Sequence, residues 1–253
     1  MYTRAIVRTP GKSFLKGLTT SNLGLPNLNK ALFQHREYIR VLQSCGLEVL
    51  VLEADEDYPD STFVEDTALL TTQCAIITNP GAPSRKGETA AMKEVLQDFY
   101  PTVEQITPPG TAEGGDILKV GTHFYIGLSE RTNLKGAQQV IEILNEYGLD
   151  GSTVRLDNVL HLKTGISYLE RNIMAASGEF LSKAEFKKYK ILKVAEAESY
   201  AANCLWINGT VLVPQGFPQT QEAIEYTGYR TKAVDVSEFR KMDGGLSCLS
   251  LRF

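Results

Sequence analysis

Residues 204–213 read CLWINGTVLV, and this stretch is the clearest indication of how the chain folds. Two apolar runs flank Asn208 and Gly209, and both of these residues tolerate the positive φ angles of a two-residue hairpin turn. The stretch therefore predicts two antiparallel strands joined by a tight turn. Residues 67–77 and 116–126 show a similar strand-turn-strand pattern, so the hairpin is a repeated element of the chain.

Amphipathic helices and further short strands are expected between the hairpins. One predicted helix has five apolar residues on a single face, namely Leu134, Ala137, Ile141, Leu144 and Tyr147. A short strand is expected after each helix, at residues 48–53, 103–107, 153–157, 190–194 and 232–236. These strands recur every roughly 40–55 residues, a spacing typical of stacked supersecondary units.

The pattern predicts an α/β fold of about five strand-turn-strand-helix-strand units that form a single domain over residues 1–253. Residues 246–253 and 5–8, at the two chain ends, would complete one unit together. Five such units can ring a central axis as a five-bladed α/β propeller. A two-layer α/β domain is the alternative that the periodicity alone leaves open.

The composition is that of an ordinary globular protein, with 253 residues of which 43% are hydrophobic and 22% are charged. The net charge is −4, and the Lys and Arg residues are scattered, so we expect no nucleic-acid partner. No apolar run approaches the length that spans a bilayer, and the N-terminus has no apolar signal-peptide core. We therefore expect a cytoplasmic protein without a membrane partner.

The four cysteines lie far apart, and their spacing is not that of a zinc site, so no metal is expected. Cys45, Cys74 and Cys204 are interpreted as small core residues. Cys248 lies shortly after the turn-forming pair Gly244–Gly245, with Leu246 and Ser247 between them. Such a turn could expose the thiol at a strand end. A buried position in the final strand is the alternative reading of Cys248.

Three histidines are present, and His161 is the best candidate for function because it follows a predicted strand in a loop. His35 on the first helix and His123 in a hairpin strand are expected to have packing roles. Several acidic residues also lie at predicted strand ends, where they could line a pocket for a planar cation: Asp60, Glu65, Asp66, Glu113 and Asp116. The alternative for each acidic residue is a turn or cap position.

Four motifs in this order resemble those of the dimethylarginine dimethylaminohydrolase family: FVEDTA at 63–68, EGGD at 113–116, HLK at 161–163 and GGLSC at 244–248. That family belongs to the guanidine-modifying superfamily, together with arginine deiminase and the amidinotransferases. The resemblance covers essentially the whole chain and implies a five-bladed α/β propeller.

The resemblance also implies catalytic roles. Cys248 would be the nucleophile, His161 the general acid and base, and Glu113 the residue that orients His161. Asp66, with Glu65 nearby, would hold the guanidinium nitrogens. These residues are far apart in the sequence, so the implied roles require that they surround one flat cationic group.

Further residues are implied to contact the amino-acid part of the substrate. Asp60 and the backbone of Leu18, in the loop over residues 11–27, would meet the α-amino group. Arg85 and Arg131 would pair with the α-carboxylate, which the planar fork of an arginine grips at two points. Ser247, directly before the nucleophile, is also expected to contact the substrate.

The activity implied is hydrolysis of asymmetric dimethylarginine or monomethylarginine to citrulline and an amine, through a covalent thiouronium on Cys248 and without any cofactor. A homodimer is a further expectation. An arginine deiminase-like hydrolase of another guanidine is the first alternative, although deiminases generally carry an additional helical domain that this chain has no room for. A non-catalytic propeller that binds a partner is the second, but such relatives lack the Cys and His pair.

Overall fold

The computed structural model describes residues 1–253 and divides them into two compact units. The first unit comprises Met1–Val64 and Gly165–Phe253, and the second comprises Glu65–Thr164. The expected single domain over residues 1–253 stays a prediction.

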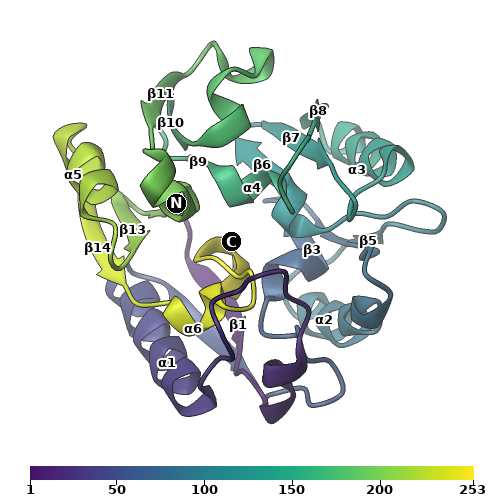
Figure 1. The fold of residues 1–253 in the computed structure, drawn as a ribbon. Coiled ribbons are helices and arrows are strands. Elements are labelled where there is room, and N and C mark those ends of the chain that lie inside the picture. Colours follow the sequence, from purple (N-terminus) through teal and green to yellow (C-terminus); the bar gives the residue numbers. More distant parts are fainter. The chain divides into compact units, whose positions relative to one another are not determined.

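Three three-stranded sheets belong to the first unit, with strand orders β15-β1-β2, β11-β10-β9 and β12-β13-β14 (Figure 1). Their strands are β1 (Arg4–Arg8), β2 (Glu48–Leu52), β9 (Ile166–Tyr168), β10 (Ile173–Ala176), β11 (Lys190–Lys193), β12 (Leu205–Ile207), β13 (Thr210–Pro214), β14 (Arg230–Val234) and β15 (Leu251–Arg252). The α-helices of this unit are α1 (Leu28–Ser44), α5 (Pro218–Tyr226) and α6 (Ser237–Arg240).

Two further three-stranded sheets, β3-β4-β5 and β6-β7-β8, belong to the second unit. Their strands are β3 (Ala68–Leu70), β4 (Ala75–Ile77), β5 (Val103–Gln105), β6 (Ile117–Val120), β7 (His123–Leu128) and β8 (Asp150–Arg155). The helices are α2 (Glu88–Gln97) and α3 (Leu134–Glu146), and the short α4 (Leu162–Gly165) ends at the boundary of the unit.

All five sheets have the same pairing. The middle strand is antiparallel to one neighbour and parallel to the other, as in β12-β13-β14 and β6-β7-β8. In four sheets a tight turn joins the antiparallel pair, and the parallel strand follows a longer crossover. In the fifth sheet the antiparallel pair is β15 with β1, from the two ends of the chain. The predicted number of five units and their strand pairing are therefore confirmed. The predicted helix is missing from one unit, since β10 is connected to β11 by two 3-10 turns, Gly178–Leu181 and Ala184–Phe186.

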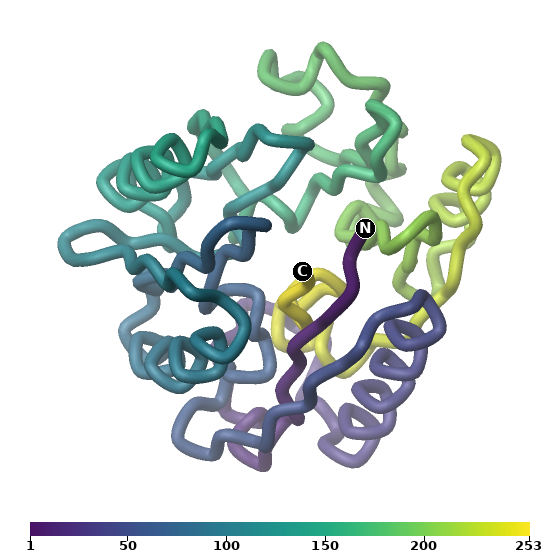
Figure 2. Tube along the Cα trace, turned by 180° about the vertical axis from the view of Figure 1, so that it is seen from behind, coloured from purple at the N-terminus to yellow at the C-terminus, as the bar shows by residue number.

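The two chain ends share one sheet, as predicted. Strand β1 pairs with β15 in antiparallel orientation through Ala5 and Arg252, and with β2 in parallel orientation. Figure 2 shows the N-terminal segment in purple running beside the C-terminal segment in yellow. The terminal segment 246–253 forms a strand only at Leu251–Arg252. Cys248 lies before this strand, in a 3-10 turn over Ser247–Leu249.

The Asn208–Gly209 turn has the predicted geometry, with φ of 48° and 89°, and it joins β12 to β13 with Ile207 opposite Thr210. The β9–β10 hairpin was not predicted. Its turn uses Glu170, Arg171 and Asn172 with positive φ, and no Gly or Pro in the sequence marks it. Strand β8 begins at Asp150, three residues before the predicted start, because the chain already pairs there with His123 of β7.

Helix α3 illustrates how side chains determine the packing. Asn133 caps its N-terminus by accepting a hydrogen bond from the Gly136 amide. Ala137 and Leu144 of the predicted face are buried, whereas Leu134 is 53% exposed because it occupies the first turn. Apolar side chains of the sheets and helices form two core clusters in the first unit and one in the second. No helix in residues 1–253 combines the length and apolar character needed to cross a membrane.

Candidate active site

The second unit holds a buried carboxylate–imidazole pair. His161 Nε2 lies 2.8 Å from Glu113 Oε2, and Glu113 is completely buried. Glu113 Oε1 accepts a hydrogen bond from the Ala82 amide and lies 3.8 Å from Arg131 Nη1. A histidine that is fixed by a buried carboxylate has a defined ring orientation and a defined proton position.

The glycines of the EGGD motif are required by close contacts. A Cβ on Gly114 would lie 1.9 Å from the Glu65 carbonyl oxygen, which is impossible without moving the backbone. A Cβ on Gly115 would lie 2.7 Å from His161 Nδ1 and 2.8 Å from Asp66 Oδ1. The amide of Gly115 instead donates to Asp66 Oδ1 at 2.8 Å. The two glycines therefore let the carboxylates approach the imidazole.

Asp116, the last residue of the motif, fixes two turns. Its Oδ1 accepts from the Leu162 amide at 2.9 Å, directly after His161. Its Oδ2 accepts from the Ser129 hydroxyl at 2.6 Å, and Ser129 Oγ in turn accepts from the amide of Arg131. Asp116 is fully buried, and through these hydrogen bonds it fixes the turns that carry His161 and Arg131.

Asp66 binds a guanidinium group within the protein itself. Arg85 Nη1 donates to Asp66 Oδ2 at 2.5 Å, and all three residues of the cluster Asp66, Arg85 and Glu88 are buried. Glu88 accepts from Arg85 Nε and Nη2, so it holds the other edge of the guanidinium. Burial acts to lower the pKa of Arg85, but the charges of Glu88 and Asp66 outweigh it and raise that pKa.

Glu65 has a different partner from Asp66. Its Oε1 lies 2.6 Å from Lys163 Nζ, and the Glu65 side chain is only 4% exposed. Arg131 keeps 21% of its side chain exposed, so its guanidinium is the more accessible of the two predicted carboxylate-binding arginines.

The pKa values of His161 and Glu113 are shifted in opposite directions. Burial acts to lower the pKa of His161, but the carboxylates of Asp66, Asp116 and Glu113 outweigh it and raise the pKa to about 9. Burial acts to raise the pKa of Glu113, but the hydrogen bond and charge of His161 hold it well below its usual range. His161 is therefore protonated at neutral pH and can donate a proton.

Asp66, Glu113 and His161 also place three ligand atoms within 4.8 Å of one another, close enough to bind one metal ion. A metal on this trio would have to displace the hydrogen bond between His161 and Glu113 and the ion pair between Asp66 and Arg85. The absence of a metal requirement stays a prediction.

Replacing Glu113 by glutamine is expected to lower the pKa of His161 by roughly one to three pH units, because the imidazolium loses an adjacent carboxylate. A titration of the histidine ring by NMR on labelled protein measures it directly. Glu104→Gln is the matched control, since Glu104 lies in the same unit and accepts instead from the Tyr147 hydroxyl. A His161 titration that is the same in Glu113→Gln and in the unmodified chain would contradict the expected coupling.

Cys248 lies in the first unit, in a tight 3-10 turn with its thiol half-buried. The amide of Gly245 points at its sulfur at 3.4 Å, and an N–H donor of this kind stabilises a thiolate. A Cβ on Gly244 would lie 2.2 Å from the Phe63 ring, and one on Gly245 would lie 2.6 Å from the Asn203 side chain. The paired glycines thus allow the turn, as expected, and the turn presents the thiol.

Four other residues fix the turn that carries Cys248. Asn203 accepts from the Ser247 amide and donates to the Ser247 hydroxyl, both at 3.0 Å. Tyr38 and Tyr200 donate to the carbonyl oxygens of Leu246 and Gly244, and Arg252 donates to that of Ser247. The position of Cys248 is therefore determined by side chains from several elements of the unit.

Asp60 and Leu18 also come together in the first unit. The Leu18 amide donates to Asp60 Oδ1 at 3.0 Å, and a Cβ on the preceding Gly17 would meet the same oxygen at 2.5 Å. Asp60 is buried, whereas the Leu18 side chain is 43% exposed.

The structure thus groups the predicted site residues in two sets: Glu65, Asp66, Arg85, Glu113, Arg131 and His161 in one unit, and Leu18, Asp60, Ser247 and Cys248 in the other. That the two sets act on one substrate stays a prediction, as do the individual roles. Sequence reasoning missed Asn203 and Glu88. Glu88 could have been found from its spacing of three residues after Arg85, whereas nothing in the sequence marks Asn203.

The chain is similar to known proteins of one family. The family model for N,N dimethylarginine dimethylhydrolase, eukaryotic, matches residues 20–196. The N(G),N(G)-dimethylarginine dimethylaminohydrolase of Pseudomonas aeruginosa is 56% identical over 254 residues, which is 100% of both chains.

Two solved structures are similar over 100% of both chains, each with a TM-score of 0.99 and 56% identity. One is a cysteine-to-serine mutant of the Pseudomonas aeruginosa enzyme complexed with citrulline. The other is a histidine-to-glycine dimethylarginine dimethylaminohydrolase adduct with S-methyl-L-thiocitrulline. These matches confirm the predicted fold class, an α/β fold of five repeated units. The chain belongs to the dimethylarginine dimethylaminohydrolase family.

Proposed function

We propose that this chain hydrolyses asymmetric dimethylarginine and monomethylarginine to citrulline and the corresponding methylated amine. The observation that carries the proposal is the buried Glu113–His161 pair beside Asp66, in a chain 56% identical over its whole length to an enzyme of that name. A buried, charged, hydrogen-bonded pair of this kind is costly to maintain, and such groups concentrate at catalytic sites.

The substrate guanidinium is proposed to bind at Asp66. This carboxylate already accepts a hydrogen bond from the guanidinium of Arg85, so its oxygens are placed for planar N–H donors. Keeping the substrate cationic makes its central carbon electrophilic, and a fixed carboxylate also orients it for attack. Arg85 and Arg131 are the proposed partners of the α-carboxylate, with Arg131 the more exposed. Ser247 is proposed to contact the substrate as the neighbour of Cys248.

In the first proposed half-reaction, the thiolate of Cys248 attacks the guanidinium carbon and forms a C–S bond. The Gly245 amide supports the thiolate before the attack. The C–N bond to the methylated nitrogen then breaks, and His161 gives its proton to the departing amine. Because the pKa of His161 is raised, the residue carries this proton at neutral pH. General acid catalysis of this kind raises the rate roughly 10²–10⁴-fold.

In the second proposed half-reaction, His161 is neutral after that donation and takes a proton from water. The hydroxide equivalent adds to the thiouronium carbon and the C–S bond breaks, which regenerates the thiolate. The new C–OH group gives its proton to solvent, and citrulline leaves. Glu113 stabilises the imidazolium formed in this step, which is the role of a carboxylate hydrogen-bonded to a catalytic histidine. No cofactor takes part in this scheme.

The proposed binding of the α-amino group uses Asp60 and the backbone of Leu18, which are joined by a hydrogen bond. We further propose a cytoplasmic location, supported by four cysteines that form no disulfide. A homodimer and the absence of a nucleic-acid partner stay predictions.

The product assay tests the proposal. Purified protein with asymmetric dimethylarginine is expected to release citrulline and dimethylamine in a 1:1 ratio, measured by a colorimetric citrulline assay and by chromatography of the amine. Monomethylarginine should give methylamine in the same ratio. Arginine in parallel reports the alternative activity, since a deiminase-like enzyme would release ammonia from it at the higher rate. Citrulline formation from none of the three would refute a hydrolase of this class.

A further inference from the structure

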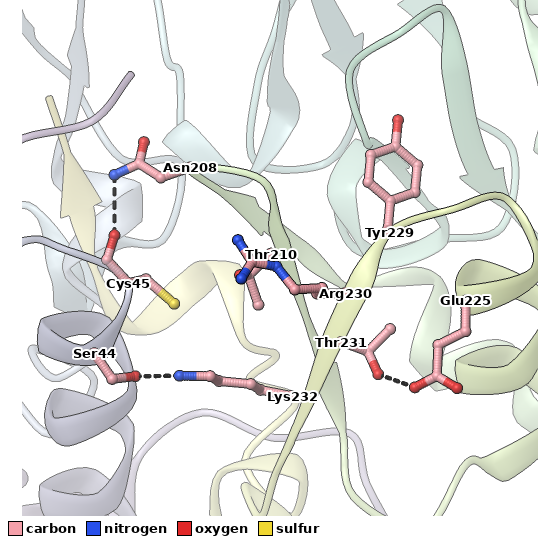
Figure 3. A pocket seen from close by; sticks show the side chains of 9 residues that line it. All are labelled: Ser44, Cys45, Asn208, Thr210, Glu225, Tyr229, Arg230, Thr231 and Lys232. Carbon is pink, nitrogen blue, oxygen red and sulfur yellow. Dashed lines mark hydrogen bonds between the residues drawn. The ribbon is translucent and has the colours of Figure 1, made fainter.

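A cavity of about 500 Å³ lies in the first unit, between the end of helix α1 and the sheet β12-β13-β14. Figure 3 shows the side chains that line it. Its size is within the range of small-molecule sites, and its lining is mainly polar. None of the residues assigned above to the hydrolytic reaction lines it.

The cavity has a cationic side. Arg230 and Lys232 are two residues apart on β14 and therefore project from the same face of the strand. In Figure 3 both extend towards α1, whereas Thr231 and Glu225 lie on the other side and hydrogen-bond to each other. Neither cation forms an ion pair in the structure, and Lys232 Nζ donates only to Ser44 Oγ at 2.5 Å. The side of the cavity that faces α1 thus carries two positive charges without a carboxylate.

A hydroxyl without a partner lies on the same side. Thr210 is the strand partner of Arg230 and is only 8% exposed, yet its hydroxyl has no hydrogen bond in the structure. The hydroxyl oxygen itself is not sealed from solvent, so water can satisfy it until a ligand enters. Because Thr210 lines the cavity, its hydroxyl is available to a polar ligand there.

The thiol of Cys45 lies in the same cavity. Its sulfur points towards the side chains of Thr210 and Arg230 in Figure 3, and it is half-buried, whereas Cys74 and Cys204 are buried. The Asn208 amide donates to the carbonyl oxygen of Cys45 at 3.1 Å, which fixes the backbone and so the position of the thiol. Cys45 is therefore accessible and held beside the two cations.

We propose that this cavity binds small disulfides that carry carboxylates, and that Cys45 exchanges with them to form a mixed disulfide. The Cys45 thiolate attacks one sulfur of the bound disulfide, a new S–S bond forms and the old one breaks. The released thiolate takes up a proton, so the disulfide is the oxidant and one of its halves is the reduced product.

The charges at this site determine which disulfide is selected. Cys45 terminates α1, and the carbonyl groups at a helix C-terminus disfavour negative charge. Arg230 and Lys232 offset that effect and attract the carboxylates of the incoming molecule, while the Thr210 hydroxyl donates to one of them. Removing the two cations should therefore slow an anionic disulfide selectively.

The experiment measures the rate at which Cys45 of the full chain is modified, by peptide mass mapping at low ionic strength. Oxidised glutathione is the anionic probe, and cystamine is the cationic probe. In the unaltered chain, oxidised glutathione should modify Cys45 faster than cystamine does. In Arg230→Gln/Lys232→Gln the glutathione rate should fall roughly tenfold, a usual size for electrostatic steering, while the cystamine rate should not fall.

Lys187→Gln/Lys190→Gln is the matched control, because it removes two exposed cations from the same unit away from the cavity. It should leave both rates within twofold of the unaltered chain. Thr210→Val, which keeps the side-chain shape, should also slow the glutathione reaction. Equal effects of the two double variants on the glutathione rate would overturn the proposal. In the unaltered chain, absence of glutathione from Cys45 would also overturn the proposal. So would modification of Cys45 by cystamine at the same rate as by oxidised glutathione.

Discussion

Cys248→Ser is expected to abolish turnover of dimethylarginine, with a loss on the order of 10⁴-fold or more. The proposed reaction begins with a C–S bond, and a serine hydroxyl is ionised far less than a thiol at neutral pH. The fold should be kept, because a serine oxygen can accept the Gly245 amide as the sulfur does and the turn is fixed by Asn203 and Tyr38. Steady-state citrulline formation and an unfolding curve give both quantities.

Cys45→Ser is the control for this loss, since Cys45 is the other half-buried thiol of the unit. It should hydrolyse dimethylarginine at the rate of the unaltered chain. A Cys248→Ser variant that retains more than a few per cent of turnover would exclude the covalent scheme. An unfolding midpoint well below that of the unaltered chain would mean that the loss reports folding instead of chemistry.

The repeated unit of the fold could be predicted because its signals are local. The Asn208–Gly209 turn needs two residues that tolerate positive φ, and the apolar runs beside it define the strands. The β9–β10 hairpin escaped prediction because Glu170, Arg171 and Asn172 adopt positive φ without any glycine. A backbone conformation that these side chains disfavour is imposed by the surrounding contacts, which include the Tyr229 hydroxyl on the Glu170 carbonyl. No window of sequence contains that information.

The histidine and its carboxylate show the limits of reading a site from residues alone. His161 stood out only as one histidine in a loop, and Glu113 only as an acid beside two glycines. The glycine at position 115 lets the EGGD segment lie against the His161 ring, since a Cβ at Gly115 would collide with that ring. That contact joins residues 46 positions apart, so it could be inferred from a family resemblance but not from spacing.

Buried partners of the predicted residues were the hardest part to anticipate. Arg85 was expected to serve a substrate carboxylate, yet the structure gives it Asp66 and Glu88 as partners. Asn203 holds Ser247 from a position 44 residues away, between two elements that no motif connects. Such groups are selected to satisfy polar atoms already buried by the fold, so their identity follows from the fold and not from a local pattern.

His161→Gly should separate the two half-reactions and trap a covalent adduct on Cys248. The useful substrate is S-methyl-thiocitrulline, because its methanethiol leaving group needs no proton from a histidine. Attack by the Cys248 thiolate can therefore proceed in the variant, whereas hydrolysis of the adduct lacks its general base. The expected result is a protein mass increased by that of the substrate less methanethiol, and the addition maps to the Cys248 peptide.

With dimethylarginine the same variant should instead lose roughly 10²–10⁴-fold in turnover, because the amine now departs without a proton donor. Adduct formation from S-methyl-thiocitrulline, together with loss of turnover of dimethylarginine, assigns His161 to both steps. A merely structural role would slow the attack on both substrates equally. His123→Gly is the control, because its ring bonds to Ser152 in a hairpin strand and should leave both substrates turning over. Normal hydrolysis of S-methyl-thiocitrulline by His161→Gly, with no adduct at any time, would remove His161 from the chemistry. The raised pKa of His161 would then have no catalytic use.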